Sequence, residues 1–281
     1  MQPINKNFKK AILKLLFFTF FTQLFTLLVT RNFYSTPLVE EAYEPFGQSV
    51  GGAVANSLSL ILVIFIFGIF LAFLVKFKKF NFVKTIVTSF LMASVFSLTF
   101  ILSSTIFPDS SLLPFIFSIL ASLLVLLVAY FKQFSFLSKF LSFLIAAEAA
   151  GYFATILQPP TVFVFPILLA SYDVYAVFAG PLKKILGKPK RVKGKIKIKL
   201  DFLPLLIVDF DLIKIGLGDV VFYSMLPAVG FVLFGIEKMI LTLLATNVGV
   251  LLTILLLMKK KIPLPGLPIP MLLGVLSLIL P

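Results

Sequence analysis

Four carboxylate residues interrupt long apolar stretches of this 281-residue chain: Glu148, Asp173, Asp219 and Glu237. Stretches of this kind are long enough to cross a bilayer, and an ionised carboxylate at the bilayer centre costs at least about 2.5 kcal/mol. Each acid therefore needs a structural or functional reason. Two carboxylates brought together can act as a general acid and a general base, or they can carry protons or ions.

Asp173 and Asp219 are the two acids that the sequence places at a common depth. The stretch that holds Asp173 breaks at Gly180 and Pro181, about 12 Å further along a helix. The stretch that holds Asp219 follows Lys214, which lies about 7.5 Å before the acid. Both carboxylates are therefore expected in the same half of the membrane, where they can face each other.

The other two acids have different explanations. Glu237 precedes Lys238 at a predicted turn, where solvent reaches it. Glu148 lies in the small-residue run 146–151 (AAEAAG), where close helix packing can bury it against a partner. We expect a structural or gating role for Glu148 in preference to a catalytic one.

Composition indicates an all-α polytopic membrane protein. Hydrophobic residues make up 60% of the chain, which is more apolar surface than one soluble core of this length can hide. The formal net charge of +14 is attributed to basic cytoplasmic loops, and no nucleic-acid partner is expected. The absence of His and Cys excludes Ser–His, HExxH zinc and cysteine-nucleophile proteolysis. No metal or other cofactor is predicted.

About 20 apolar residues cross a bilayer as a helix, and the hydropathy pattern predicts nine such spans. The first follows a lysine-rich start and is interpreted as an uncleaved span, since no small-residue cleavage site follows it. Very short connections predict tight hairpins at 158–160 and at 237–238. The predicted spans are 11–29, 52–75, 85–106, 113–131, 137–157, 160–180, 215–235, 239–258 and 263–280.

Basic residues divide between the two sides of this nine-span arrangement. All but Arg31 and Lys238 of the 25 Lys and Arg residues fall on the N-terminal side. Since cytoplasmic loops are enriched in Lys and Arg, this predicts a cytoplasmic N-terminus and an external C-terminus. The one long loop, 181–214, is then cytoplasmic.

This loop contains two segments typical of β-structure. Residues 192–200 (VKGKIKIKL) alternate apolar and basic side chains, which predicts a strand with one solvated face. A second β-rich run, 205–213 (LLIVDFDLI), follows it, and together they predict a small cytoplasmic β-hairpin between helices 6 and 7. The alternative is a disordered basic linker on anionic headgroups.

Glycines and prolines mark two further places at the depth of the acids. Asp219 ends the run 216–219 (GLGD), whose glycines remove side chains where a substrate, water or another backbone must approach. Four prolines interrupt 263–270 (PLPGLPIP) at the start of the ninth span. Irregular backbone at membrane depth is tolerated where it lines a cavity or packs in protein.

Three motifs carry a resemblance to a known family: Tyr172-Asp173, the GLGD run at 216–219, and 265–268 (PGLP). They resemble the signature motifs of presenilin and signal peptide peptidase, the GxGD intramembrane aspartyl proteases, and the nine-span layout agrees. Residues 216–224 (GLGDVVFYS) look closer to presenilin, and the short chain looks like an archaeal presenilin homologue. Gly266 stands where the family has Ala, so a small residue is retained and function is expected to survive.

The resemblance implies an intramembrane aspartic endopeptidase that cleaves transmembrane segments of proteins or peptides. Asp173 and Asp219 would be catalytic and share a proton, since like charges so close in a low dielectric cannot both ionise easily. Residues that would bind substrate or shape the site are Tyr172, Gly216, Leu217, Gly218, Pro265, Gly266, Leu267 and Pro268.

The chain is expected to form one membrane-embedded protease domain. Its parts would be a scaffold (1–157), a catalytic pair of helices (160–235) with the loop 181–214, and a last pair (239–281) with the Pro-Gly-Leu motif. A prokaryotic cell membrane is the expected location, and a homo-oligomer is left open.

Two other functions fit parts of the pattern. A proton- or ion-coupled transporter or channel also uses paired acids and broken helices, but it predicts an inverted repeat that the sequence lacks. A prepilin or preflagellin peptidase also uses a GxGD-type aspartate, but it has no counterpart of the proline-rich ninth span. For the protease, we expect the run before Gly216 and the loop 265–268 to offer strand-like pairing to an unwound substrate.

Overall fold

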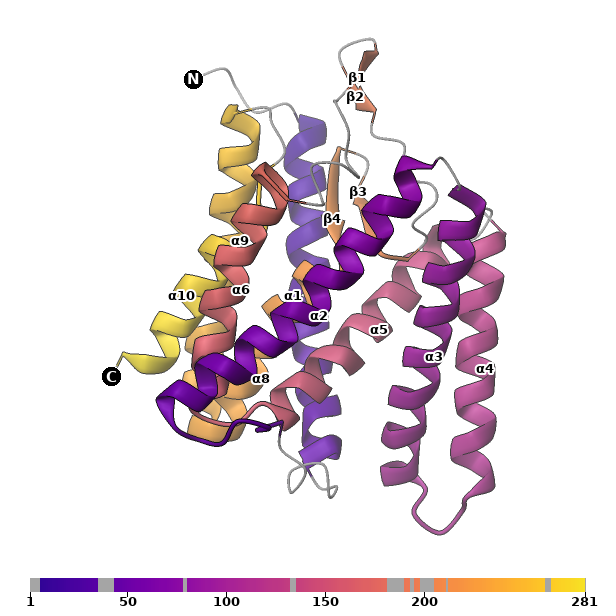
Figure 1. The fold of residues 1–281 in the computed structure, drawn as a ribbon, viewed down its shortest axis with the longest axis vertical. Helices are drawn as coiled ribbons and strands as arrows, with labels where there is room; N and C mark the ends of the chain where they lie inside the picture. The colour runs from indigo at the N-terminus through magenta and orange to yellow at the C-terminus, as the bar shows by residue number, and fades with distance from the viewer. Residues whose placement is uncertain are drawn as a thin grey trace.

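The computed structural model describes residues 6–34, 43–77, 80–131, 135–180, 190–192, 195–197, 205–210, 212–260 and 264–280. Over these residues the chain forms nine α-helices and four short strands (Figure 1). The helices are α1 (Lys6–Tyr34), α2 (Val50–Lys76), α3 (Phe80–Ile106), α4 (Leu112–Tyr130), α5 (Ser135–Ile156), α6 (Thr161–Phe178), α8 (Leu217–Phe234), α9 (Ile236–Lys260) and α10 (Pro268–Ile279). The strands are β1 (Lys190–Val192), β2 (Lys195–Lys197), β3 (Ile207–Phe210) and β4 (Ile213–Gly216).

The helices confirm the predicted membrane architecture. Eight of those in the described part of the chain are long and apolar enough to cross a bilayer, and each coincides with one of the first eight predicted spans. The ninth expectation, a span over 263–280, is wrong in extent, because regular helix runs only from Pro268 to Ile279. At 1.5 Å per residue, α10 is about 18 Å long. The helix does not begin earlier because the prolines lack the N–H groups that an earlier start would need as hydrogen-bond donors. The chain is a multi-pass integral membrane protein.

Helix α8 forms the centre of the bundle and contacts α1, α5, α9 and α10. About two thirds of its span (67%) is buried, against 44% or less in every other candidate span. Small side chains on α5 also allow α5 to approach α1 closely. At Gly151, an added Cβ would lie 2.8 Å from Val29 of α1. The acid at the start of α8 is therefore held on the most buried of the candidate spans.

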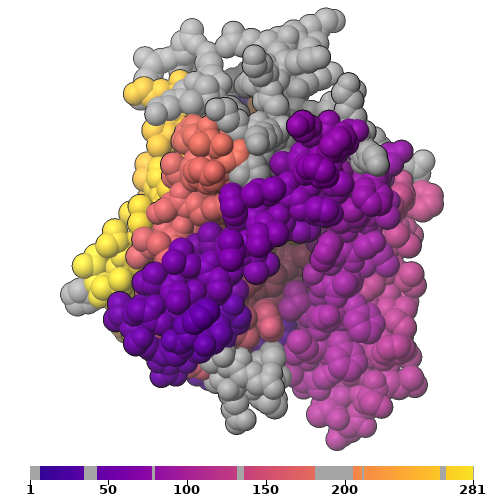
Figure 2. Space-filling view, viewed as in Figure 1, coloured from indigo at the N-terminus to yellow at the C-terminus, as the bar shows by residue number. Residues whose placement is uncertain are grey.

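Helices α2, α3 and α4 make up the periphery. Only 22% to 33% of their spans is buried, and they expose many Phe, Leu and Ile side chains. Such surfaces are stable in lipid, where apolar exposure carries no penalty. Helix α2 crosses this face diagonally between α6 and the α3–α4 pair (Figure 2).

The loop between α6 and α8 contains two antiparallel hairpins, β1–β2 and β3–β4. The predicted β-structure is thus confirmed, but the predicted partition is wrong. Residues 192–200 do not form one strand, since β1 and β2 are separate antiparallel strands in which Val192 pairs with Lys195. Residues 193–194 and 198–200 lie outside the described part.

The second hairpin also differs from the predicted single run at 205–213. The chain reverses after Phe210, and β4 carries the strand pairing on to Gly216. Val208, Phe210, Ile213 and Ile215 are buried, whereas the other face carries an Asp209–Lys214 ion pair at 3.0 Å. This two-sided alternation fixes the register of the hairpin immediately before α8.

The tight connection predicted at 158–160 is present, and the one predicted at 237–238 lies instead at Gly235, since Glu237 and Lys238 belong to the first turn of α9. Helix α5 ends at Ile156 and α6 begins at Thr161, while only Gly235 separates α8 from α9. Gly235 has a φ of +87°, which a residue with a side chain rarely adopts. In Figure 1 the start of α1 and both hairpins lie at the same end of the molecule, as the predicted topology requires.

Candidate active site

Helix α6 supplies the first acid of the site. Asp173 lies in the penultimate turn of the helix and is only 8% exposed. Its Oδ2 atom accepts a hydrogen bond from the backbone N–H of Leu267 at 2.9 Å. A side chain on α6 is thereby joined to the N-cap residue of α10.

The first turn of α8 supplies the second acid. Gly216 is the N-cap of α8, so Asp219 is the third residue of the helix. The backbone N–H of Gly216 hydrogen-bonds to the Asp219 carboxylate, which is the side-chain half of a capping box. An acid in the first turn also interacts favourably with the helix dipole. Local helix chemistry therefore orients this carboxylate.

Gly266 lies between the two acids. A Cβ atom added there would lie 2.7 Å from Oδ2 of Asp219, and the next residue in the chain is the Leu267 that binds Asp173. The carbonyl oxygen of Gly266 accepts a hydrogen bond from the Tyr223 hydroxyl at 2.8 Å. The two carboxylates also interact with each other electrostatically. The structure thus brings together the two acids and the proline-rich segment that the sequence placed at one depth.

The remaining predicted site residues occupy different surroundings. Gly218 is exposed, and an added Cβ would meet no atom within 4 Å. Leu217, by contrast, is buried in the apolar core. Pro265 is partly exposed next to Gly266, and Pro268 is the first residue of α10.

Tyr172 points in another direction than its neighbour Asp173. Its ring packs edge-on against Phe65 of α2, with the ring centres 6.2 Å apart. Of the residues predicted to shape the site, Gly218 is exposed and Pro265 is partly exposed, while Leu217 is buried in the core.

The other two membrane acids lie elsewhere. Glu148 is buried on α5, where both carboxylate oxygens lie 3.3 Å from the Thr99 hydroxyl on α3. This is the buried partner expected for a structural role. Glu237 is exposed in the first turn of α9, as predicted for a solvated turn.

Tyr223 and Gln23 are parts of the site region that the sequence interpretation did not identify. Tyr223 follows Asp219 by four residues, so the two share one face of α8. Gln23 is a lone amide in the first span, fully buried, and donates to the Tyr223 carbonyl at 3.1 Å. Two signals in the sequence could have identified them: the four-residue spacing of Tyr223 from Asp219, and the position of Gln23 as a polar residue inside an apolar span.

The arrangement provides two adjacent carboxylates. Backbone N–H groups of Leu267 and Gly266 bond to Asp173, the N–H of Gly216 bonds to Asp219, and Gly218 is exposed beside Asp219. Among the described residues, no three His, Cys, Asp or Glu side chains gather as metal ligands would. Two carboxylates suffice for general acid–base activation of water.

Comparison with known proteins identifies the fold. The chain superposes on a structure of a presenilin family intramembrane aspartate protease in space group C222 with a TM-score of 0.66 and 19% identity, covering 95% of this chain and 97% of the other. A second structure of such a protease, in space group P2, gives a TM-score of 0.63 and 18% identity, covering 93% and 94%. The fold is therefore that of the presenilin family intramembrane aspartate proteases.

Sequence similarity is more local. Presenilin-B of Dictyostelium discoideum is 32% identical over 123 residues, which is 41% of this chain. The match spans about a quarter (24%) of that relative's length. No family model matches the sequence.

Proposed function

We propose that this chain is a presenilin-family intramembrane aspartyl endopeptidase, with Asp173 and Asp219 as its catalytic pair. The observation that carries the proposal is the convergence of both carboxylates on the Gly266–Leu267 segment. The convergence occurs inside a bundle that shares its fold with proteases of this class. Transmembrane proteins or peptides are the proposed substrates.

In the proposed reaction the two carboxyl groups share one proton. The ionised group takes a proton from a water molecule, whose oxygen attacks the scissile carbonyl carbon, while the protonated group gives its proton to the carbonyl oxygen. Collapse of the resulting diol breaks the C–N bond and transfers a proton to the leaving amine. Backbone N–H groups of Leu267 and Gly266 bond to the Asp173 carboxylate and hold it in position for this reaction.

Strand β4 supplies the proposed pairing surface for an unwound substrate. Leu217 N–H donates to the Leu206 carbonyl at 2.7 Å, and in an antiparallel ladder every second residue bonds to the partner strand. Residues 213 and 215 therefore bond to β3, whereas the N–H and C=O of Lys214 point to the free edge. This edge leads through Gly216 to Asp219, so added substrate backbone would run toward the acids.

We further propose that the chain resides in a prokaryotic cell membrane with its hairpins on the cytoplasmic side. The cytoplasmic placement of the hairpins rests on the basic residues, 23 of 25 of which fall on the side of the α6–α8 loop. A homo-oligomer is compatible with this topology.

Reconstitution in liposomes tests the proposed activity. The purified chain is expected to cleave a single-span peptide, and a hydroxyl-containing aspartyl-protease transition-state inhibitor should stop the cleavage. Proton and cation flux is recorded on the same vesicles. Flux without cleavage would replace the protease with a transporter.

A further inference from the structure

One peptide unit is hydrogen-bonded at both of its polar ends in the candidate site. The carbonyl of Gly266 accepts from the Tyr223 hydroxyl at 2.8 Å, and the N–H of Leu267 donates to Asp173 at 2.9 Å. These two groups belong to the same planar peptide and point in opposite directions. The pair of bonds therefore fixes the rotation of this plane about the chain.

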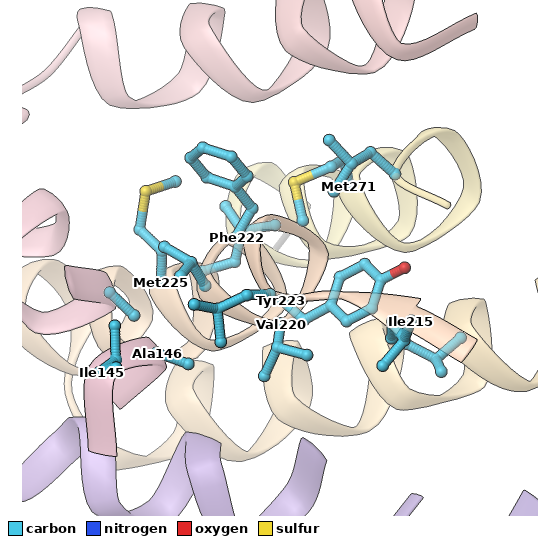
Figure 3. Packing of buried hydrophobic residues seen from close by; sticks show 14 of the residues in the cluster. Ile145, Ala146, Ile215, Val220, Phe222, Tyr223, Met225 and Met271 are labelled. Carbon is cyan, nitrogen blue, oxygen red and sulfur yellow. The ribbon is translucent and has the colours of Figure 1, made fainter. Parts of the chain in front are cut away.

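Tyr223 reaches this peptide from the helix that carries the second acid. It is only 2% exposed, and it lies one turn after Asp219 on the same face of α8. Figure 3 shows its ring within the apolar cluster, with the hydroxyl oxygen directed away from Phe222 and Met225. Apolar packing thus fixes the ring while its only polar atom faces the site.

The main chain of Tyr223 is also anchored. In an α-helix its carbonyl would accept from the residue four positions later, but that residue is Pro227, which has no N–H. The side-chain amide of Gln23 on α1 satisfies this carbonyl at 3.1 Å and also donates to Thr246 of α9 at 3.1 Å. Asn247 of α9 in turn donates to the Gln23 carbonyl oxygen. Helices α1 and α9 therefore fix the position of the Tyr223 main chain relative to the site.

We propose that Tyr223 is a positioning residue for the two-aspartate reaction, acting through the Gly266–Leu267 peptide on Asp173. Its hydroxyl holds the peptide plane at the angle that presents Leu267 N–H to Oδ2. Hydrogen bonds in such a chain polarise one another, so the hydroxyl also strengthens the contact to Asp173. The inference rests on the proposed proteolytic function.

Tyr223→Phe tests the inference in the full-length chain in liposomes. The substitution keeps the packed ring and removes one hydroxyl. We expect kcat for a single-span peptide to fall about tenfold to a hundredfold, because a misaligned catalytic group costs rate before it costs binding. KM and the melting temperature should stay close to those of the wild type. A role in general packing alone would not separate kcat from KM in this way.

Tyr130→Phe is the matched control. Tyr130 contacts the Thr85 hydroxyl at 3.0 Å between α3 and α4, so this variant also loses a hydroxyl contact between helices, but away from the site. Its kcat and KM are expected to equal those of the wild type.

Two results would overturn the inference. A Tyr223→Phe enzyme with wild-type kcat would show that the hydroxyl positions nothing. A loss of kcat that only follows a loss of folded protein would assign Tyr223 a structural role. If the wild type is active and Tyr223→Phe has the same kcat, the inference fails while the proposed function stands. If the wild type is inactive, both the inference and the proposed function fail.

Discussion

A Cβ atom on Gly266 would lie 2.7 Å from Oδ2 of Asp219, closer than real Cβ contacts come. The proline-rich segment and the first turn of α8 are thus in contact through a residue that has no side chain. In the sequence, glycine at position 266 was only a departure from the family's alanine. In the structure it has a steric reason, because a side chain there would collide with the Asp219 carboxylate.

Gly266→Ala should therefore lower activity. The added methyl group must turn the Asp219 carboxylate away from its present position, and we expect about a tenfold loss in kcat. Kinetics on the reconstituted chain measure this. Gly51→Ala is the control, since its Cβ would meet nothing closer than 4.0 Å. A Gly266→Ala enzyme as fast as the wild type would show that Asp219 tolerates the displacement.

The hydrogen bond from Leu267 to Asp173 is tested by removing its donor. Leu267 has a φ of −77°, which proline can adopt, so Leu267→Pro deletes the N–H with little backbone strain. We expect about a hundredfold loss of kcat. Leu267→Ala keeps the N–H and loses the buried side chain, and it should retain more activity at a lower melting temperature. Equal losses in the two variants would argue against the hydrogen bond.

The pairing edge of β4 is tested with a pair of prolines. Lys214→Pro removes an N–H that points away from β3, and Asp209→Pro removes the corresponding N–H on the opposite edge of the hairpin. Both variants lose the same ion pair. We expect cleavage to fall strongly only in Lys214→Pro, measured as kcat/KM. Similar activity in the two variants would remove β4 from substrate binding.

Glu148 is expected to support the contact between α3 and α5. Glu148→Gln keeps an acceptor for the Thr99 hydroxyl, so activity and melting temperature should stay near those of the wild type. Glu148→Ala leaves a void and should lower the free energy of unfolding by about 2 kcal/mol or more. Abolished cleavage in Glu148→Gln would place Glu148 in the chemistry.

The sequence predicted most of the fold because lipid imposes a simple requirement on it. Each span must be apolar and helical, so eight span positions agree with the helices. The partition of the hairpins was missed because an alternating run such as 205–213 has the same pattern whether it continues or reverses after Phe210. The start of α10 at Pro268 depended on which of several prolines begins the helix.

The candidate site was predictable to the level of its motifs but not of its contacts. The depths of Asp173 and Asp219 follow from their distance to the span ends, and their proximity was correctly expected. The bonds through Leu267 and Tyr223 depend on the tertiary placement of the 264–267 segment. Sequence spacing carries no information on that placement.

The central claim is that Asp173 and Asp219 form one catalytic pair, and single Asp→Asn substitutions in liposomes test it most directly. Asp173→Asn and Asp219→Asn should each abolish cleavage of a single-span peptide and leave the melting temperature near that of the wild type. Retained cleavage in either well-folded variant would contradict the account.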